Sequence, residues 1–191
     1  MMKALLLNGS PRRGGNTEVL LEALAEGVRS AGGEVEMIRL ADLQIAPCIN
    51  CGGCDQTGIC IIQDDAGGVY EKVDQSRRIV LASPIYFYGI TAQAKAFVDR
   101  AQSSWSRKRI QQRKGEWRDD PHRLGFFVSV AATKGEKVFD GAELTAKYFF
   151  DAIGAAYGGA LLFRGIEKRG DMEKDAAKLR QAVEFGRRII A

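Results

Sequence analysis

The chain has 191 residues, of which 46% are hydrophobic, the size and composition of one globular domain with a substantial core. No apolar run approaches the roughly 18 residues of a membrane-spanning helix, and the apolar run near the N-terminus is too short for a secretory signal, so we expect a soluble, cytoplasmic protein. Residues 107–123 carry the whole net charge of +4, which argues against a protein that binds nucleic acid through a globally basic surface.

Apolar runs alternate with helical periodicities along the chain. The run from Ala4 to Leu7 is typical of a strand buried on both faces, and Leu20, Leu24 and Val28 recur four residues apart on the helix that follows. In the same way we expect strands near residues 4–7, 34–40, 79–82, 124–132 and 160–163, and helices near 16–31, 65–75, 91–103, 142–153 and 171–190. This alternation predicts a single α/β domain over residues 1–191, with helices on both faces of a parallel sheet.

Three turns, at residues 8–17, 83–90 and 130–136, follow strands and lie at the edge where such sheets bind ligands. The first, NGSPRRGGNTE, matches neither common nucleotide-binding fingerprint. Its two glycines and the helix after it nevertheless favour an anion such as phosphate, although an ordinary turn that caps the helix would look similar. The polar side chains available to an anion are those of Ser10, Arg12, Arg13, Asn16 and Thr17.

The second turn, SPIYFYG, places three aromatic residues after a buried strand. A flat heteroaromatic ring could pack there against backbone and aromatic surface. Packing beneath a helix or in a dimer interface is an equally good explanation for the three aromatic side chains.

The stretches KALLLNGSPRRGGNTE and ASPIYFYGITAQAKAFVDR, with the cysteine run between them, resemble the flavodoxin-like NADPH-dependent FMN reductase family, in its iron–sulfur flavoprotein branch. The resemblance implies a flavodoxin-like three-layer sandwich with a five-stranded parallel sheet, bound FMN and a homodimer or homotetramer. It also implies which residues contact FMN: Ser10, Arg12, Asn16 and Thr17 at the phosphate, Pro84, Ile85, Tyr86, Phe87 and Gly89 at the ring, and Thr133 from the third turn.

All four cysteines lie in one run, CINCGGCDQTGIC, within a predicted insertion at residues 47–65. Disulfides are disfavoured in a reducing compartment, and two of them in so short a run would be strained. A [4Fe–4S] cluster, a zinc ion and free thiols remain as alternatives. The run resembles the compact motif of the iron–sulfur flavoproteins, which makes the cluster the preferred interpretation, with Cys48, Cys51, Cys54 and Cys60 as its ligands.

The sequence therefore predicts an FMN-dependent oxidoreductase that transfers electrons and carries a [4Fe–4S] cluster. The alternative is an NAD(P)H-dependent FMN or quinone reductase without a cluster. A zinc-knuckle module that binds nucleic acid through Trp105 and Trp117 is less well supported, because the basic charge is confined to one segment. No catalytic acid or base is expected, and the single histidine, His122, is interpreted as a surface residue.

The segment 104–123 is predicted to be a basic loop. Low-potential ferredoxins are acidic partners that such a surface attracts, so Arg107, Lys108 and Arg109 form a candidate docking site for a ferredoxin.

Overall fold

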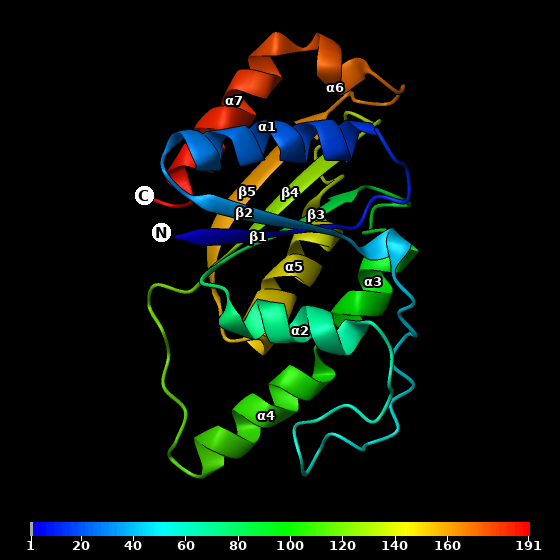
Figure 1. The fold of residues 1–191 in the computed structure, drawn as a ribbon. Coiled ribbons are helices and arrows are strands. Elements are labelled where there is room, and N and C mark those ends of the chain that lie inside the picture. Colours follow the sequence, from blue (N-terminus) through cyan, green and yellow to red (C-terminus); the bar gives the residue numbers. More distant parts are fainter. Residues whose placement is uncertain (1) are drawn as a thin grey trace.

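The computed structural model describes residues 2–191 and contains one sheet of five parallel strands in the order β2-β1-β3-β4-β5 (Figure 1). The predicted flavodoxin-like α/β fold is thereby confirmed. The order reverses between β1 and β3, and a crevice at their carboxyl ends is the expected ligand position. The strands are β1 (Lys3–Asn8), β2 (Glu34–Arg39), β3 (Arg78–Pro84), β4 (Leu124–Ala131) and β5 (Ala156–Arg164).

Helices cover both faces of the sheet, which gives the three layers of the sandwich (Figure 1). Consecutive residues of β1 enter different cores, because side chains alternate along a strand. Leu6 packs with Leu20 and Leu24 of α1, whereas Leu5 and Leu7 face the core beneath α2, α3 and α5. The helices are α1 (Asn16–Ser30), α2 (Ala66–Gln75), α3 (Ala92–Asp99), α4 (Gln102–Arg113), α5 (Asp140–Ala152), α6 (Asp171–Lys174) and α7 (Ala176–Arg188), with a 3-10 turn at Leu40–Asp42.

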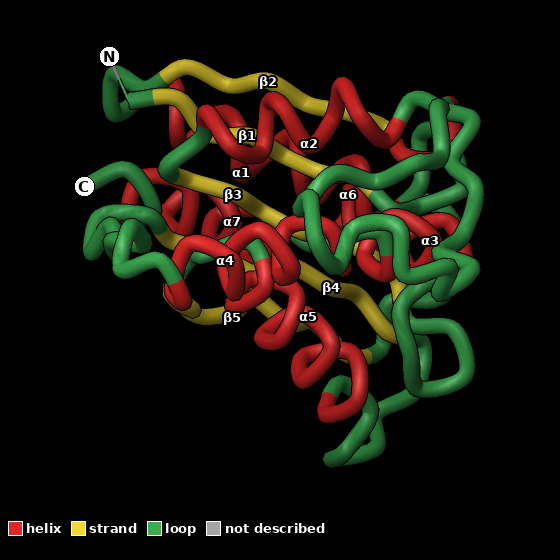
Figure 2. Tube along the Cα trace, turned by 90° about the horizontal axis from the view of Figure 1, so that it is seen from below, coloured by secondary structure: helices red, strands yellow, loops and turns green. Residues whose placement is uncertain are grey.

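The loops after the strands gather at one edge of the sheet, opposite the two chain ends (Figure 2). The segment 47–65, predicted to be an insertion, lies at the same side of the molecule and contains no helix or strand. None of the described helices is long and apolar enough to cross a membrane.

The prediction of a basic loop at 104–123 is wrong over its first half, because residues 102–113 form α4. The predicted helix 91–103 instead ends at Asp99, and the chain turns before α4 begins. Helix α4 lies beyond α2 and α5, away from the sheet (Figures 1 and 2). It buries only two serines, so it has no apolar stripe by which the sequence could reveal it.

The predicted last helix, 171–190, is also divided in two. The side chain of Asp175 accepts a hydrogen bond from the backbone N–H of Lys178, at 3.0 Å, and so caps α7 after the short helix α6. An N-cap residue lies outside the helical conformation, and the chain therefore breaks at Asp175.

Candidate functional site

A cavity of about 200 Å³ opens at the carboxyl ends of the strands, above the point where the strand order reverses. It contains seven of the ten residues predicted to contact FMN; Phe87, Gly89 and Thr133 do not line it. Its walls are formed by Ser10, Arg12, Gly15, Asn16, Thr17, Pro84, Ile85, Tyr86, Val130, Ala132, Ile166 and Glu167.

The loop between β1 and α1 is held by its own side chains. The side chain of Asn8 accepts the Ser10 N–H at 2.9 Å, and the hydroxyl of Ser10 accepts the Arg12 N–H at 3.3 Å. Gly15 is the N-cap residue, so no capping side chain competes for the amides of the first turn of α1. A Cβ at Gly15 would lie 3.1 Å from that of Arg12 and 3.8 Å from the Ser10 hydroxyl, and would fill the cradle. These features fit a phosphate group.

The cations around this loop differ in how far they are already paired. Arg13 forms an ion pair with Asp42 at 3.0 Å, whereas Arg12 is exposed and has no ion pair within residues 2–191. Arg169 donates to the backbone oxygen of Arg13 at 3.2 Å and lies over Gly14. Arg12 is therefore the cation most available to a bound anion, with Arg169 as a neighbour that the sequence did not indicate.

Asn16 is committed to a structural role. Its side-chain amide donates to the backbone oxygen of Lys168 at 2.8 Å, and its oxygen accepts the N–H of Met172 at 3.1 Å. These bonds tie the start of α1 to the segment between β5 and α6. The backbone N–H of Asn16 in the first turn of the helix and the second hydrogen of its side-chain amide are left for an anion.

The aromatic turn after β3 is a tight hairpin. Tyr86 and Gly89 exchange two backbone hydrogen bonds, of 2.9 and 3.0 Å, across Phe87 and Tyr88. Both central residues have positive φ, 48° and 62°, which is a conformation that Asn-Gly favours and that aromatic residues adopt at a cost of roughly 1–2 kcal/mol each. Such strain is typical of ligand-binding segments, and the Phe87 side chain is fully exposed beside the cavity wall.

Thr91 joins the hairpin to the first loop. Its N–H donates to the hydroxyl of Ser83 at 3.0 Å, its hydroxyl donates to the backbone oxygen of Gly9 at 2.6 Å, and the same hydroxyl caps α3 by accepting the N–H of Ala94. The third loop is less closely engaged. Thr133 is exposed and accepts a 3.3 Å bond from Gly135, while Ala132 lines the cavity in its place.

The four cysteines line a second, much smaller cavity of about 20 Å³, together with Arg100 at the end of α3. All four are free thiols. Positive φ angles at Asn50, Gly52 and Gly58 let the backbone curl around them. Four thiols on one cavity are the donor set of a [4Fe–4S] cluster, and in that sense the residues fit it. The cavity has room for about one water molecule, so the loop would have to open around a cluster.

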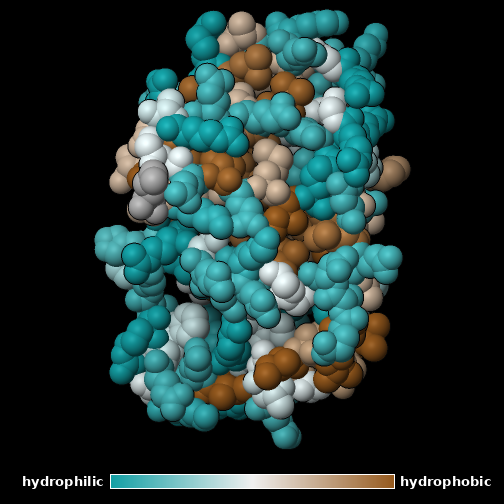
Figure 3. Space-filling view, viewed as in Figure 1, coloured by the Kyte–Doolittle hydropathy of each residue, from teal (hydrophilic) through white to brown (hydrophobic). Residues whose placement is uncertain are grey.

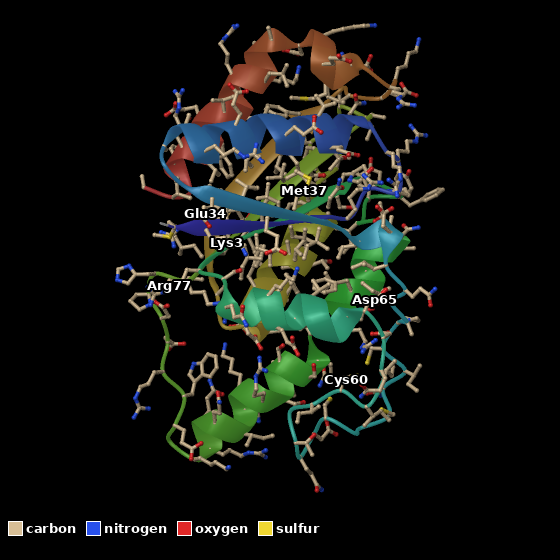
Figure 4. The ribbon with its side chains drawn as sticks, in the orientation of Figure 1. Lys3, Glu34, Met37, Cys60, Asp65 and Arg77 are labelled. Carbon is tan, nitrogen blue, oxygen red and sulfur yellow. The ribbon has the colours of Figure 1, made fainter. Side chains whose placement is uncertain are left out.

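The cysteine side chains are not brought into a coordination sphere. Over residues 2–191, no three Cys, His, Asp or Glu side chains are placed to hold a metal ion. Figure 4 shows Cys60 beside the start of α4 and Asp65 at the start of α2, both on the arm of this loop that leads into α2.

A buried ion pair holds the ends of the cysteine loop. Arg100 donates to Asp64 at 2.6 Å and to the backbone oxygens of Ala46 and Ile62 at 3.0 and 3.1 Å. Burial lowers the pKa of Arg100, but Asp64 and the sulfur of Cys60 outweigh it, and the net pKa is raised. Burial raises the pKa of Asp64, but Arg100 and two backbone amides together lower it by more, so the net pKa of Asp64 is lowered. Both groups are therefore charged at neutral pH.

Isoleucine side chains leave the outside of the cysteine loop apolar. Ile49, Ile59 and Ile61 are each more than half exposed, and hydrophobic surface appears at the lower right of Figure 3, over this part of the molecule.

Comparison with known proteins agrees with these observations. The model of the NADPH-dependent FMN reductase family matches residues 2–138. An iron–sulfur flavoprotein of Methanocaldococcus jannaschii is 40% identical over 53% of the chain, and one of Archaeoglobus fulgidus is 38% identical over 52%. Those alignments cover 52% and 45% of the relatives, so the chain spans about half their length.

One further relative matches from end to end. YwqN of Bacillus subtilis, provisionally named an NAD(P)H-dependent FMN-containing oxidoreductase, is 28% identical over the whole chain and 99% of its own length. Among solved structures, a flavone reductase superposes with a TM-score of 0.72 over 98% of this chain and 62% of its own, at 20% identity. An NAD(P)H:quinone oxidoreductase from Methanothermobacter marburgensis superposes with a TM-score of 0.68 over 97% of this chain and 98% of its own, at 15% identity. These superpositions confirm the fold, and the family match shows that the chain belongs to the NADPH-dependent FMN reductases, a family of flavin-dependent oxidoreductases.

Proposed function

We propose that this chain is an electron-transfer flavoprotein that binds FMN in the cavity above β1 and β3 and a [4Fe–4S] cluster on Cys48, Cys51, Cys54 and Cys60. The observation that carries the proposal is the convergence of all four thiols on one cavity, in a chain whose phosphate-type loop is fully formed. When bound, FMN supplies two-electron and one-electron chemistry, and the cluster supplies one-electron transfer.

The residues of the large cavity have separate tasks in this proposal. The first turn of α1 and the Arg12 guanidinium receive the phosphate, since amides and a free cation converge there. Pro84, Ile85 and Tyr86 line the cavity and would form the wall for the isoalloxazine ring, and Phe87 extends from the same hairpin. Thr91 keeps the two loops in register through its bond to Gly9.

The relatives named iron–sulfur flavoproteins support the cluster, because five of them are 36–41% identical to this chain over about half of its length. A cytoplasmic location is proposed as well, because cysteines that ligate a cluster must stay reduced.

A second function has its own supporting observation. The described side chains form no group that could hold a metal ion, and the relative that matches end to end is named for NAD(P)H and FMN alone. An NAD(P)H-dependent FMN or quinone reductase, in which the cysteines are redox-active or inert thiols, is therefore the alternative proposal.

Anaerobic reduction distinguishes the two functions. The protein is mixed in separate experiments with NADPH and with a reduced low-potential ferredoxin, and the flavin and iron–sulfur absorbances are followed together. The electron-transfer proposal expects the ferredoxin to bleach both chromophores. Rapid bleaching of flavin by NADPH, in protein that shows no iron–sulfur absorbance, would establish the alternative instead.

In this proposal a ferredoxin would dock on α4, but only part of the positive charge of α4 is free to attract it. Arg107 forms an ion pair with Asp74 at 2.7 Å, and Lys108 forms one with Asp151 at 3.0 Å. The guanidinium of Arg109 lies over the ring of Trp105, 5.0 Å from its centroid. We therefore expect Arg109→Glu to slow reduction by ferredoxin more than Lys108→Glu does. Equal rates in both variants and the wild type would remove α4 as the docking site.

A homodimer or homotetramer is proposed for the assembly. Sedimentation equilibrium measures this oligomeric state.

A further inference from the structure

The junction of α3 and α4 brings two polar side chains against the cysteine loop. Arg100 follows α3 and lines the small cavity, and Ser106 lies one turn into α4. Both are almost completely buried, with relative exposures of 3% and 2%. Among the residues that the structure describes, the Nε of Arg100 has no hydrogen-bond partner.

The hydroxyl of Ser106 is directed at a sulfur atom. Its Oγ lies 3.7 Å from the Sγ of Cys54, within range of an O–H···S hydrogen bond. A serine inside a helix ordinarily bonds back to a carbonyl of the preceding turn, as Ser103 does to Arg100 at 3.1 Å. The Ser106 hydroxyl instead bonds across to the cysteine loop, which is unexpected for a residue with a merely structural role.

Both groups act in the same electrostatic direction. A cluster bound by four thiolates gains negative charge when it is reduced. A hydroxyl that donates to a ligand sulfur and a buried guanidinium both stabilise that extra charge, and so raise the reduction potential. Asp64 partly offsets the charge of Arg100, so the effect of Arg100 on the potential is mixed with that of Asp64. The effect of the uncharged Ser106 is easier to isolate.

We infer that Ser106 and Arg100 are positioning residues that raise the reduction potential of a cluster held by the four cysteines. The inference rests on the cluster of the proposed function, and it adds two residues outside the cysteine run.

The test measures the midpoint potential of the cluster in an EPR-monitored titration of protein reconstituted anaerobically with ferrous iron and sulfide. Ser106→Ala removes the hydroxyl and nothing else. We expect it to lower the potential by a threefold to tenfold shift of the reduction equilibrium, where tenfold is about 59 mV for one electron. Ser104→Ala is the matched control, because Ser104 is buried on the same helix and, unlike Ser106, makes no hydrogen bond to a cysteine sulfur among the described residues. Its potential should equal that of the wild type.

A second pair of variants isolates the charge of Arg100. Arg100→Lys and Arg100→Gln both lose the fork that anchors the loop, and they differ by one positive charge. The Gln variant should have the lower potential of the two. Identical potentials in Ser106→Ala and the wild type, or in the two Arg100 variants, would overturn the inference while leaving the cluster in place. A wild type that takes up no iron and sulfide would overturn the cluster itself, and the inference with it.

Discussion

The first loop of the sheet is held from several sides, whereas residues 47–65 are held chiefly at their ends. Asn8, Ser10 and Thr91 fix the first loop through side-chain bonds to its backbone. The cysteine loop has short-range turns inside it, the ion pair of Arg100 with Asp64 at its base, and the contact of Cys54 with Ser106. The difference indicates that the large cavity is formed without a ligand, whereas the cysteine loop would have to open around a cluster.

The largest expected effect separates the two regions outright. Cys54→Ser should abolish the binding of iron and sulfide and leave about one FMN per chain, because the phosphate loop shares no residue with the cysteine cavity. Iron, sulfide and flavin analysis of the anaerobically purified variant measures this. If FMN were lost in parallel with iron, the two regions would form one site and the comparison would fail.

The base of the cysteine loop is expected to matter for folding. Asp64→Asn leaves the Arg100 charge buried without a partner, which should cost about 3–5 kcal/mol at neutral pH. The folded pKa of Asp64 is lowered, so its contribution to stability is present above the unfolded pKa of about 3.9 and is lost as the pH falls through the folded value. Urea unfolding at pH 7 and at successively lower pH should show the wild type and variant converging below about pH 4.

A stability difference that stayed constant down to pH 2 would contradict this account of the ion pair. It would mean that the effect of Asp64→Asn came from the two backbone bonds that Asp64 accepts, from Ala46 and Ala66, and not from its charge.

The phosphate loop is expected to respond to one of its arginines more than to the other. Arg12→Ala should weaken FMN binding by about tenfold to a hundredfold, the range of a lost charge-assisted hydrogen bond. Arg13→Ala is the matched control, since Arg13 is already paired with Asp42 and should change the dissociation constant less. Fluorescence quenching of FMN by the apoprotein measures both. Equal effects of the two variants would show that the arginines act only through general charge.

The smallest effect concerns strain in the aromatic hairpin. Tyr88 has a φ of 62°, so Tyr88→Gly should raise the free energy of unfolding of the apoprotein by about 1 kcal/mol. Tyr88→Ala, which keeps a Cβ, serves as the control and should bring no such gain. Urea unfolding compares the three proteins, and a loss of stability in the glycine variant would show that the ring of Tyr88 contributes more than its backbone strain costs.

Much of the fold could be predicted because buried parallel strands leave a strong pattern. The apolar runs at β1, β3 and β4 carry their own signal, and the alternation of strand and helix fixes the architecture. Helix α4 could not be predicted, because it is polar almost all round and is held by ion pairs to Asp74 and Asp151 and by contact with the cysteine loop.

The parts of the candidate site formed by continuous segments could be predicted from the sequence. The parts that depend on partners distant in the sequence could not. The sequence indicated the first loop, the aromatic hairpin and the cysteine run as separate segments. It could not indicate Thr91, Arg100 or Arg169, since each acts on a backbone group or side chain far away in the sequence. For the same reason, it could not indicate that the side chain of Asn16, predicted to contact phosphate, also bonds to residues more than 150 positions later.

The most direct test of the account is the content of FMN, iron, acid-labile sulfide and zinc in one sample purified without oxygen. The account predicts about one FMN, four iron and four sulfide per chain, and no zinc. One FMN with neither iron nor zinc would contradict it, and would leave the four cysteines as thiols beside a flavin reductase.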